Sequence, residues 1–584
     1  MGKYIKLFST HSEYESFTQT DEFVKPNVSH CVQENEVHYN PWTWAEEYLT
    51  TVALEDGTIS FNIWKSMGTD MITSISYSTD GGETWTTTAN QDNKQENLVI
   101  DVNVNEGDKV MWKGIATQLG YFDEDDYGDY VGSFFSSDCE FDVKGNVMSL
   151  LYGDDFKGEI TIEEDFTFCW LFSDYDGEKT CGIVNAKDLS LPATTLADYC
   201  YYNMFYKCSS LVTAPSVLPA TTLAKRCYYD MFYGCTSLVT APELPATTLA
   251  ERCYASMFYE CTSLETAPEL PALELKTECY EEMFSNCTSL TSAPELPATI
   301  LKPGCYSAMF EMCSNLVTVP NLPATTLSTA CYGYMFGGCT SLTSAPELPA
   351  TTLAERCYLG MFAGCTSLTT APELPATTLA EQCYGDMFQE CTNLITAPEL
   401  PATTLEERCY RYMFQECTSL ETAPTLPATT LEEECYSYMF SGCTSLTTAP
   451  ILSATTLVYS CYDNMFNGCT SLTTAPELPA TTLVEQCYAH MFDGCISLTT
   501  APELPATTLA EECYGYMFRG CTNLNYIKAM FTTTPSGSSP NYYTSNWVSG
   551  VASSGTFVKN SAATWNVSGV NGIPTGWAVE TASE

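Results

Sequence analysis

Residues 248–270, TLAERCYASMFYECTSLETAPEL, are one copy of the unit from which most of this chain is built. Close copies fill the region from about residue 191 to residue 524, and in every copy a second Cys follows the first by eight residues. Successive copies are 26 residues apart, except for one step of 27. Thirteen copies at a fixed period predict a solenoid, in which each unit buries its apolar side against its neighbours. The first Cys of each copy is Cys200, Cys227, Cys253, Cys279, Cys305, Cys331, Cys357, Cys383, Cys409, Cys435, Cys461, Cys487 or Cys513.

The first half of the repeat has the spacing of an amphipathic helix. Cys253, Met257 and Cys261 recur every four residues, which places them on one face of a helix. Thr248 and Glu251 fit a capping box at its start. In seven copies a Gly precedes the second Cys, where a left-handed residue can end a helix.

The second half of the repeat predicts a short strand. In SLTTAPELP, at 367–375, outward and inward positions alternate before two prolines stop the pattern. Pro372 and Pro375 have no amide hydrogen to donate, so the strand cannot be long. One strand and one helix per unit predict an α/β solenoid with a parallel sheet on one side and helices on the other.

The pattern (A/M)-F-x-G-C-T-S-L-T-x-x-x-x-L-P resembles the BspA-like leucine-rich repeats of gut Bacteroidales proteins and of the crAss-like bacteriophages that infect these bacteria. The resemblance covers the whole array and, more loosely, its flanks. The longer period and the inserted P-A-T-T-L depart from the common form of the family. The resemblance implies a leucine-rich-repeat fold and an adhesive, non-enzymatic protein, and it fixes no binding partner.

The bulk composition excludes several classes of partner. The chain has 584 residues, a formal net charge of −49 and a pI near 4.1. Such a charge argues against binding to nucleic acid or to an anionic membrane. No stretch of eighteen apolar residues is present, so we expect no membrane insertion. The first residues lack the apolar run of a signal peptide, which fits a virion protein, because virions leave the cell by lysis.

Of the 30 Cys, the 26 in the array, two in each of the thirteen copies, are expected to be buried, reduced thiols. Cys253 and Cys261 would lie about 12 Å apart along a helix, which is beyond the reach of a disulfide. Equivalent Cys of adjacent repeats would lie about 5 Å apart with parallel Cβ vectors, slightly too far for an unstrained bond. Reduced thiols behave as small apolar residues and would form two buried columns. With four His and no clustered Cys pairs, we expect no metal site and no cofactor.

Two regions precede the array. Residues 1–48 form an aromatic-rich leader that we interpret as an attachment segment, and the alternative is an edge strand packed on the next domain. Residues 49–140 predict a small β-sandwich-like domain, in which Asp80 belongs to an S-x-D-x-G-x-x-W motif. This motif resembles the Asp-box of sialidases, a structural hairpin that implies no sialidase activity. The acidic loop 123–129 departs from a Ca²⁺ loop at Tyr127, which favours a solvated loop. Strands are expected at 58–64, 72–77, 84–88, 98–104 and 109–113.

Caps are expected at both ends of the solenoid. Residues 141–190 predict an N-terminal cap of degenerate repeats, because Phe168 and Phe172 echo the Y-x-x-M-F core of the repeat. The solenoid itself occupies 191–524. Residues 525–584, rich in Ser, Gly, Thr and Trp, predict a β-rich C-terminal cap that closes the open edge of the sheet.

The sequence contains no P-loop, nucleophile elbow, zincin or dinucleotide motif, and we expect no catalytic residues and no enzymatic activity. A polysaccharide depolymerase remains a weaker alternative, because it would need a carboxylate pair such as adjacent repeats could supply. Every column of a solenoid shares that spacing, so the spacing singles out no site. The Glu of the A-P-E-L segment forms one such column, at Glu243, Glu269, Glu295, Glu347, Glu373, Glu399, Glu477 and Glu503.

The candidate binding face is the predicted helical side. The two residues after each Cys-Tyr pair differ in nearly every copy, and Tyr, Ser, Gly, Asn and Asp dominate there, as they do in binding loops. The alternative is that these positions vary because nothing constrains them. The candidate binding residues are Tyr202, Tyr229, Tyr334, Tyr412, Tyr438 and Tyr516.

We therefore expect a non-enzymatic structural or binding protein of a phage particle, a fibre or decoration protein that presents the array for adhesion. Its expected partners are other virion proteins, through the N-terminal segment, and a host cell-surface protein or glycan. A homo-oligomer is compatible with the sequence. The alternative is a BspA-like adhesin on a bacterial cell surface.

Overall fold

The computed structural model describes residues 5–8, 29–32, 46–63, 71–89, 98–123, 129–173, 181–539 and 542–582. The chain divides into two compact units, Met1–Pro271 and Ala272–Glu584, which are described separately. Most of the predicted attachment segment and of the acidic loop 123–129 lies outside the described residues. In the leader, β1 (Ile5–Phe8) pairs in parallel with β2 (Ser29–Val32).

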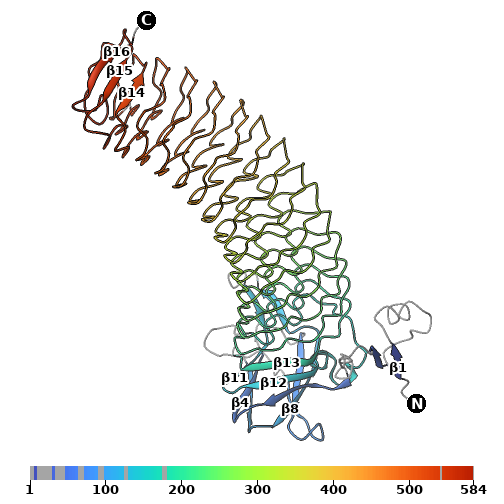
Figure 1. Ribbon diagram of the computed structural model, residues 1–584. Coiled ribbons are helices and arrows are strands. Elements are labelled where there is room, and N and C mark those ends of the chain that lie inside the picture. Colours follow the sequence, from blue (N-terminus) through green and yellow to red (C-terminus); the bar gives the residue numbers. More distant parts are fainter. Residues whose placement is uncertain are drawn as a thin grey trace. The chain divides into compact units, whose positions relative to one another are not determined.

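The first unit contains two larger sheets (Figure 1). The three-stranded sheet has the order β11-β4-β7, and the six-stranded sheet has the order β13-β12-β3-β8-β5-β6. Each of the five strands expected between residues 58 and 113 overlaps an observed strand, β4 to β8. The strands are β3 (Leu49–Ala53), β4 (Gly57–Ile63), β5 (Ile72–Ser78), β6 (Thr86–Ala89), β7 (Leu98–Val104), β8 (Lys109–Ala116), β11 (Phe134–Ser137), β12 (Phe141–Asn146) and β13 (Ile183–Ser190). A separate antiparallel pair is formed by β9 (Gly120–Asp123) and β10 (Asp129–Gly132).

An aromatic cluster joins these two sheets. Trp112 of β8 is fully buried, and its ring lies 6.1 Å from that of Phe61 of β4 and 5.2 Å from that of Phe135 of β11. The indole Nε1 of Trp112 donates a hydrogen bond of 3.1 Å to the Thr51 hydroxyl, which leaves no unsatisfied polar group on the ring. The predicted Asp-box forms the turn between β5 and β6, where Asp80 accepts hydrogen bonds from Ser78 and from Thr84.

The repeats contain no helix among residues 191–524, all of which the structure describes, so the helical half of the predicted α/β solenoid is wrong. The short helices described in the chain are α2 (Ser149–Tyr152) and the 3₁₀ turn η2 (Gly153–Asp155), both before the array. Thr248 caps no helix and instead forms a parallel bridge with Thr222. No helix of the described residues is long and apolar enough to cross a membrane.

Consecutive β-turns replace the expected helix. In the coil that contains Cys383, every fourth residue has a left-handed backbone, namely Gln382 (φ 52°), Asp386 (φ 56°) and Glu390 (φ 59°). Each is the third residue of a turn closed by an amide that donates to the carbonyl three residues earlier, as Cys391 donates to Phe388 over 3.1 Å. The two residues that follow the first two of these left-handed residues are buried, Cys383 with Tyr384 and Met387 with Phe388. The four-residue period of the sequence is therefore the period of a turn.

Turn amides are satisfied in two alternating ways. Cys383, Gly385 and Met387 donate within their own coil, to carbonyls three residues back. Tyr384 and Asp386 donate to the next coil, to carbonyls 25 residues ahead, over 3.1 and 2.8 Å. A buried stretch of turns is therefore stable because every second amide links neighbouring coils, as in a sheet.

The opposite side of each coil is also less regular than expected. Single parallel bridges, such as Thr370 with Thr396 and Thr396 with Thr422, take the place of the predicted strands. Pro372 and Pro375 follow directly, and without amide hydrogens they cannot extend the pairing. The parallel direction and the stacking of repeat on repeat agree with the prediction, but a continuous sheet does not form.

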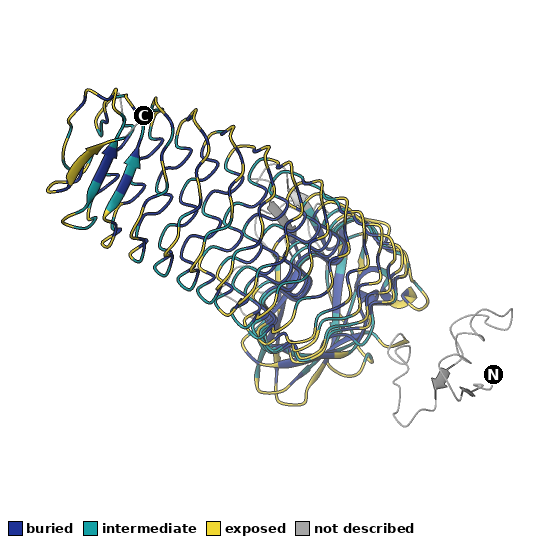
Figure 2. Cartoon of the chain, turned by 45° about the horizontal axis from the view of Figure 1, so that its top comes forward, coloured by how far each residue is buried: buried dark blue, intermediate teal, exposed yellow. Residues whose placement is uncertain are grey.

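Aromatic and thiol columns fill the interior of the coils. Figure 2 shows that buried residues recur in one coil after another. Tyr358 stacks on Tyr384, and Phe362 stacks on Phe388, each at 5.8 Å between ring centroids. Both Cys columns are buried, as expected, and in the described part of the chain 29 cysteines form no disulfide. The second column is also hydrogen-bonded, since Cys391 Sγ donates to the Phe362 carbonyl of the preceding coil over 3.1 Å.

Both ends of the array continue these columns in altered form. In the first unit Phe168 stacks on Tyr201 and Phe172 on Phe205, at 5.7 and 5.3 Å, so these residues occupy the predicted Tyr and Phe positions. In the second unit the fully buried Trp547 contacts the last members of both columns. The final sheet is parallel, with the order β14 (Tyr526–Ala529), β15 (Thr556–Lys559) and β16 (Ala578–Thr581) (Figure 1).

Candidate binding site on the turn face

We define the turn face as the side of each coil formed by the segment between its two Cys. The six candidate tyrosines lie on it at two different positions. Tyr202 and Tyr229 directly follow a Cys-Tyr pair, whereas the other four lie one residue later, at a left-handed position. Since nearly every coil has a left-handed residue there, this backbone conformation belongs to the repeat and marks no functional site.

In the first unit, Tyr202 and Tyr229 form a stacked pair with ring centroids 5.4 Å apart and an interplanar angle of 17°. The edge of the pair contacts Trp170, whose ring lies 6.2 Å from that of Tyr202. The guanidinium of Arg226 lies 5.6 Å from the Tyr229 ring centre. Both tyrosines are half-buried, so they form a ridge with one exposed edge.

In the second unit, Tyr334 is separate from the other candidates. Its side chain is 37% exposed, and its ring covers Gly360 of the next coil, where a Cβ atom would lie 2.2 Å from it. Tyr412 and Tyr438 lie in adjacent coils and pack together, at 4.8 Å and 32°. Arg411 lies 4.7 Å above the Tyr412 ring.

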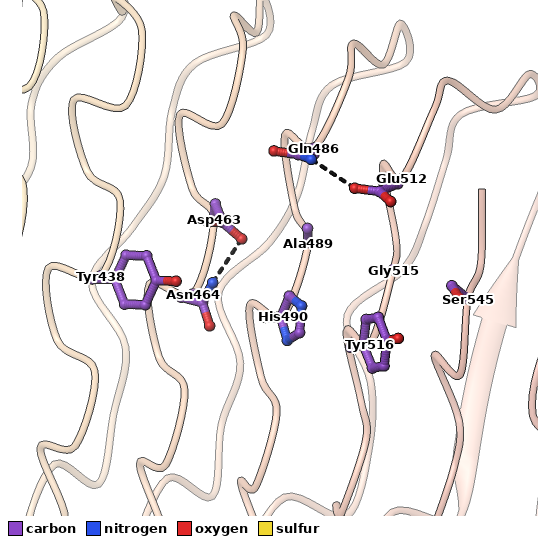
Figure 3. Close-up of a pocket in the computed structure, with 10 residues that line it drawn as sticks. All are labelled: Tyr438, Asp463, Asn464, Gln486, Ala489, His490, Glu512, Gly515, Tyr516 and Ser545. Atoms are coloured by element: carbon purple, nitrogen blue, oxygen red, sulfur yellow. Dashed lines mark hydrogen bonds between the residues drawn. The ribbon is translucent and has the colours of Figure 1, made fainter. Parts of the chain in front are cut away.

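Tyr438 and Tyr516 line one pocket with a volume of about 170 Å³ (Figure 3). The coils of Asn464 and His490 lie between them, and the Tyr438 hydroxyl is directed toward Asn464. On the other side, His490 stacks on Tyr516 at 4.6 Å and 8°. The lining consists of Tyr438, Asp463, Asn464, Gln486, Ala489, His490, Glu512, Gly515, Tyr516 and Ser545.

One side of the pocket carries a half-buried carboxylate, that of Asp463. Asp463 Oδ1 accepts a hydrogen bond of 2.8 Å from the Asn464 amide, whose own oxygen accepts one of 2.8 Å from Asn467. Burial raises the pKa of Asp463 to about 6, because it removes water from the charged form. Burial, and then the charge of Asp463, raise the pKa of Tyr438. Both groups therefore remain hydrogen-bond donors to higher pH than usual.

The rim is held by side-chain pairs between coils. Gln486 Nε2 donates to Glu512 over 2.6 Å, and its oxygen accepts from the Ser460 hydroxyl at 3.1 Å. His490 Nδ1 lies 3.3 Å from a carboxylate oxygen of Asp493. These contacts fix the amide and the imidazole in place before any ligand arrives.

Sequence reasoning identified Tyr438 and Tyr516 but did not single out Asp463, Asn464 or His490. The signal was present, because all three occupy the same two variable positions after a Cys-Tyr pair. What could not be read from one coil is that four consecutive coils, from that of Tyr438 to that of Tyr516, place these side chains around one cavity. Glu512 and Ser545 lie outside those two positions and carried no signal.

The acidic column lies apart from the pocket, on the opposite side of the coil. All eight of its Glu residues are exposed. Two make single contacts: Glu503 pairs with Lys528 at 2.9 Å, and Glu399 accepts a hydrogen bond of 2.9 Å from Thr425. Among the described residues, no group of three or more His, Cys, Asp or Glu is placed to hold a metal ion.

Comparisons with known proteins point to one family. A family model described as "BspA type Leucine rich repeat region (6 copies)" matches residues 198–343, 329–473 and 433–549. No curated protein matches the chain. Among solved structures, the "Crystal structure of TLR13-ssRNA13 complex" is similar at 12% identity, with a TM-score of 0.20. That match covers 67% of this chain and 66% of that chain, just under two thirds of its length. With so low a TM-score, nothing about this chain follows from it.

Proposed function

The chain belongs to the BspA-type leucine-rich repeat proteins, and we propose that it is a non-enzymatic binding protein that attaches to a cell-surface protein or glycan through the turn face of its array. The observation that carries this proposal is the pocket lined by Tyr438 and Tyr516. It combines half-buried aromatic rings with polar groups that the framework already holds in place. Preorganised sites of this kind lose little side-chain entropy on binding.

The repeat separates framework from variable positions. Cys, Tyr, Met and Phe recur in every coil and are buried, so they build the scaffold. The two residues after each Cys-Tyr pair vary, and several of them, including Tyr412 and Tyr438, are only half-buried. Variation at partly accessible positions beside an unvarying scaffold is typical of binding surfaces.

A finer proposal concerns the location of the protein. The repeats resemble those of phages of gut Bacteroidales, which supports a fibre or decoration protein attached to other virion proteins through residues 1–48. The alternative is an adhesin on a bacterial surface. Mass spectrometry of purified phage particles separates the two, since a virion protein is present at stoichiometric amounts and an adhesin is absent.

Attachment itself is tested with the purified full chain on whole cells and on extracted surface polysaccharide. Replacing Tyr412, Tyr438 and Tyr516 together by Ala should weaken retention at least tenfold. The fold should survive, because Ala308 occupies the same left-handed position in another coil (φ 51°). The matched control replaces Thr370 and Thr396 by Ala on the opposite side, and retention should not change.

Loss of retention in the threonine variant but not in the tyrosine variant would place the binding surface on the bridge side and overturn the proposal. The non-enzymatic part is tested separately. Incubation with the same polysaccharide should release no new reducing ends, and their appearance would instead support a depolymerase.

A further inference from the structure

We propose that the pocket lined by Tyr438 and Tyr516 binds one uncharged sugar ring and discriminates against acidic sugars. This inference rests on the proposed binding function and names the ligand class of that site. Four properties of the pocket carry it: its size, its unused hydrogen-bonding groups, its aromatic wall and the charge of its lining.

The size of the pocket limits the ligand. The cavity volume is about 170 Å³, which is enough for several water molecules. Pockets for larger organic ligands have volumes of about 300–1,000 Å³. A single pyranose ring therefore fits, whereas a disaccharide or a nucleotide does not fit inside. A longer glycan would place one residue in the pocket and extend along neighbouring coils.

Fixed polar groups surround this space. The amide groups of Asn464 and Gln486 already use both their oxygen and their nitrogen in bonds to other side chains. Their role is to position their neighbours. Six other lining groups each have a polar atom that forms no hydrogen bond to the described part of the chain: Asp463 Oδ2, Glu512 Oε1, His490 Nε2 and the hydroxyls of Tyr438, Tyr516 and Ser545.

These unused groups match a polyol. Carboxylate oxygens only accept hydrogen bonds, whereas each sugar hydroxyl both donates and accepts. Asp463 and Glu512 could each accept a hydrogen bond from a sugar hydroxyl. The hydroxyls of the two tyrosines and of Ser545 could donate hydrogen bonds to sugar oxygens. A ligand without several neighbouring hydroxyls would bury the two carboxylates without partners, which costs more than it gains.

An aromatic wall complements the polar groups. Tyr516 covers one face of the His490 ring, and the other face is on the side of Asn464 (Figure 3). One face of a pyranose is a patch of C–H groups, which packs against such a ring. The Asp493 contact to Nδ1 and the stack on Tyr516 hold the imidazole in this orientation.

The charge of the lining disfavours anions. Asp463 and Glu512 face the cavity, and none of the ten lining residues is Lys or Arg. The nearby guanidinium groups already pair with carboxylates, and that of Arg519 also lies 4.9 Å from the Tyr516 ring centre. Arg411 pairs with Glu434 at 3.0 Å, and Arg519 pairs with Asp493. A uronic acid would bring a third carboxylate into this space, where the lining offers no Lys or Arg to receive it.

The test measures the affinity of the full chain for single sugars by calorimetry or by ligand-observed NMR. Neutral hexoses and N-acetylhexosamines form one arm, and glucuronate and galacturonate form the other. At least one neutral sugar should bind with a millimolar Kd, which is about −4 kcal/mol. The uronic acids should bind at least tenfold more weakly.

Variants assign the binding to the pocket. His490→Ala should reduce neutral-sugar affinity at least fivefold, since it removes the wall. Asp463→Asn should narrow the preference for neutral over acidic sugars, because it removes one negative charge and keeps the shape. The matched control is Asp386→Asn, which removes another half-buried carboxylate from the turn face without lining the pocket. This control should change neither the affinity for neutral sugars nor the preference for neutral over acidic sugars. Melting temperatures check that each variant is folded.

Two outcomes overturn the inference: no neutral sugar binds at tens of millimolar, or an acidic sugar binds as tightly as any neutral one. If cells or polysaccharide still retain the chain in either case, the proposed function stands and only the ligand assignment fails. If the chain is retained by neither cells nor polysaccharide, the proposed function fails as well.

Discussion

The phenol ring of Tyr384 lies parallel to that of Tyr358, with ring centroids 5.8 Å apart and an interplanar angle of 3°. Both rings are fully buried, and the Tyr384 hydroxyl has no hydrogen-bond partner among the residues that the structure describes. The ring of Tyr384 is therefore well packed, whereas its hydroxyl is buried without a hydrogen bond. The first prediction concerns this hydroxyl.

Tyr384→Phe should stabilise the second unit by about 1 kcal/mol, because an unsatisfied buried hydroxyl costs roughly 1–3 kcal/mol and phenylalanine keeps the stack. Thermal unfolding measures the change. Tyr384→Ala is the contrast and should destabilise by about 3–5 kcal/mol, since it leaves a cavity in the column. A lower melting temperature for the Phe variant would show that the hydroxyl has a partner.

Two buried carboxyl groups should make stability depend on pH. Burial raises the pKa of Asp386 and of Asp463 from 3.8 to about 6. Between these values the folded chain binds more protons than the unfolded chain, so its stability falls as pH rises through this window. Lowering the pH from about 7 to about 5 should recover roughly 1 kcal/mol for each group.

The double variant Asp386→Asn, Asp463→Asn isolates this contribution. It should be more stable than the wild type near neutral pH and should show a smaller dependence on pH. The net charge of −49 acts on both proteins almost equally, so the difference between them is informative. Identical slopes for the two proteins would mean that these carboxyl groups titrate normally.

The stability of the fold should be sensitive to an added Cβ atom at a glycine with a left-handed backbone. Gly364→Ala, at φ 72°, should destabilise by about 1 kcal/mol, because an L-residue is strained in this region. The added Cβ meets no close neighbour, since its nearest atom is 3.6 Å away, so the effect is conformational. Gly333→Ala is the control: this residue has no left-handed backbone, and the change should be neutral or slightly stabilising. If chemical denaturation showed the same loss of stability for both variants, steric crowding and not the backbone conformation would be the cause.

The thiols should react slowly. Alkylation requires the thiolate, and burial raises the pKa of Cys391 and of Cys443 well above the usual range. Native protein should take up little iodoacetamide, whereas denatured protein should be labelled at all 30 Cys. Fast native labelling, or inter-repeat disulfides in a non-reducing peptide map, would contradict this prediction.

The sequence predicted the repeat, its direction of stacking and its buried columns, because burial depends on which residues are apolar. It did not distinguish a helix from consecutive turns. Cys383, Met387 and Cys391 are spaced by four, close to the 3.6 residues of a helical turn, so both structures bury them. The distinguishing signal was the strict period of four, from which a helix would drift by 40° at each step.

The candidate site was predictable residue by residue but not as a cavity. Tyr438 and Tyr516 stood out because large aromatic side chains at variable positions suggest contact area. The cavity depends on the smaller side chains of the coils between them, such as Asn464 and Ala489. Which coils carry small residues is visible in the sequence, but the space they leave depends on rotamers that only the folded structure fixes.

The alternating hydrogen bonds of the turn amides also determine which changes in the length of the array the fold can tolerate. Tyr384 and Asp386 bond to the coil that follows, and each described coil of the second unit has backbone bonds only to adjacent coils. An unequal crossover that adds or deletes one whole coil would therefore leave the bonding of the remaining coils as it was. Array length, and with it the number and order of cavities presented to a surface, can change by recombination in whole units without redesign of the scaffold.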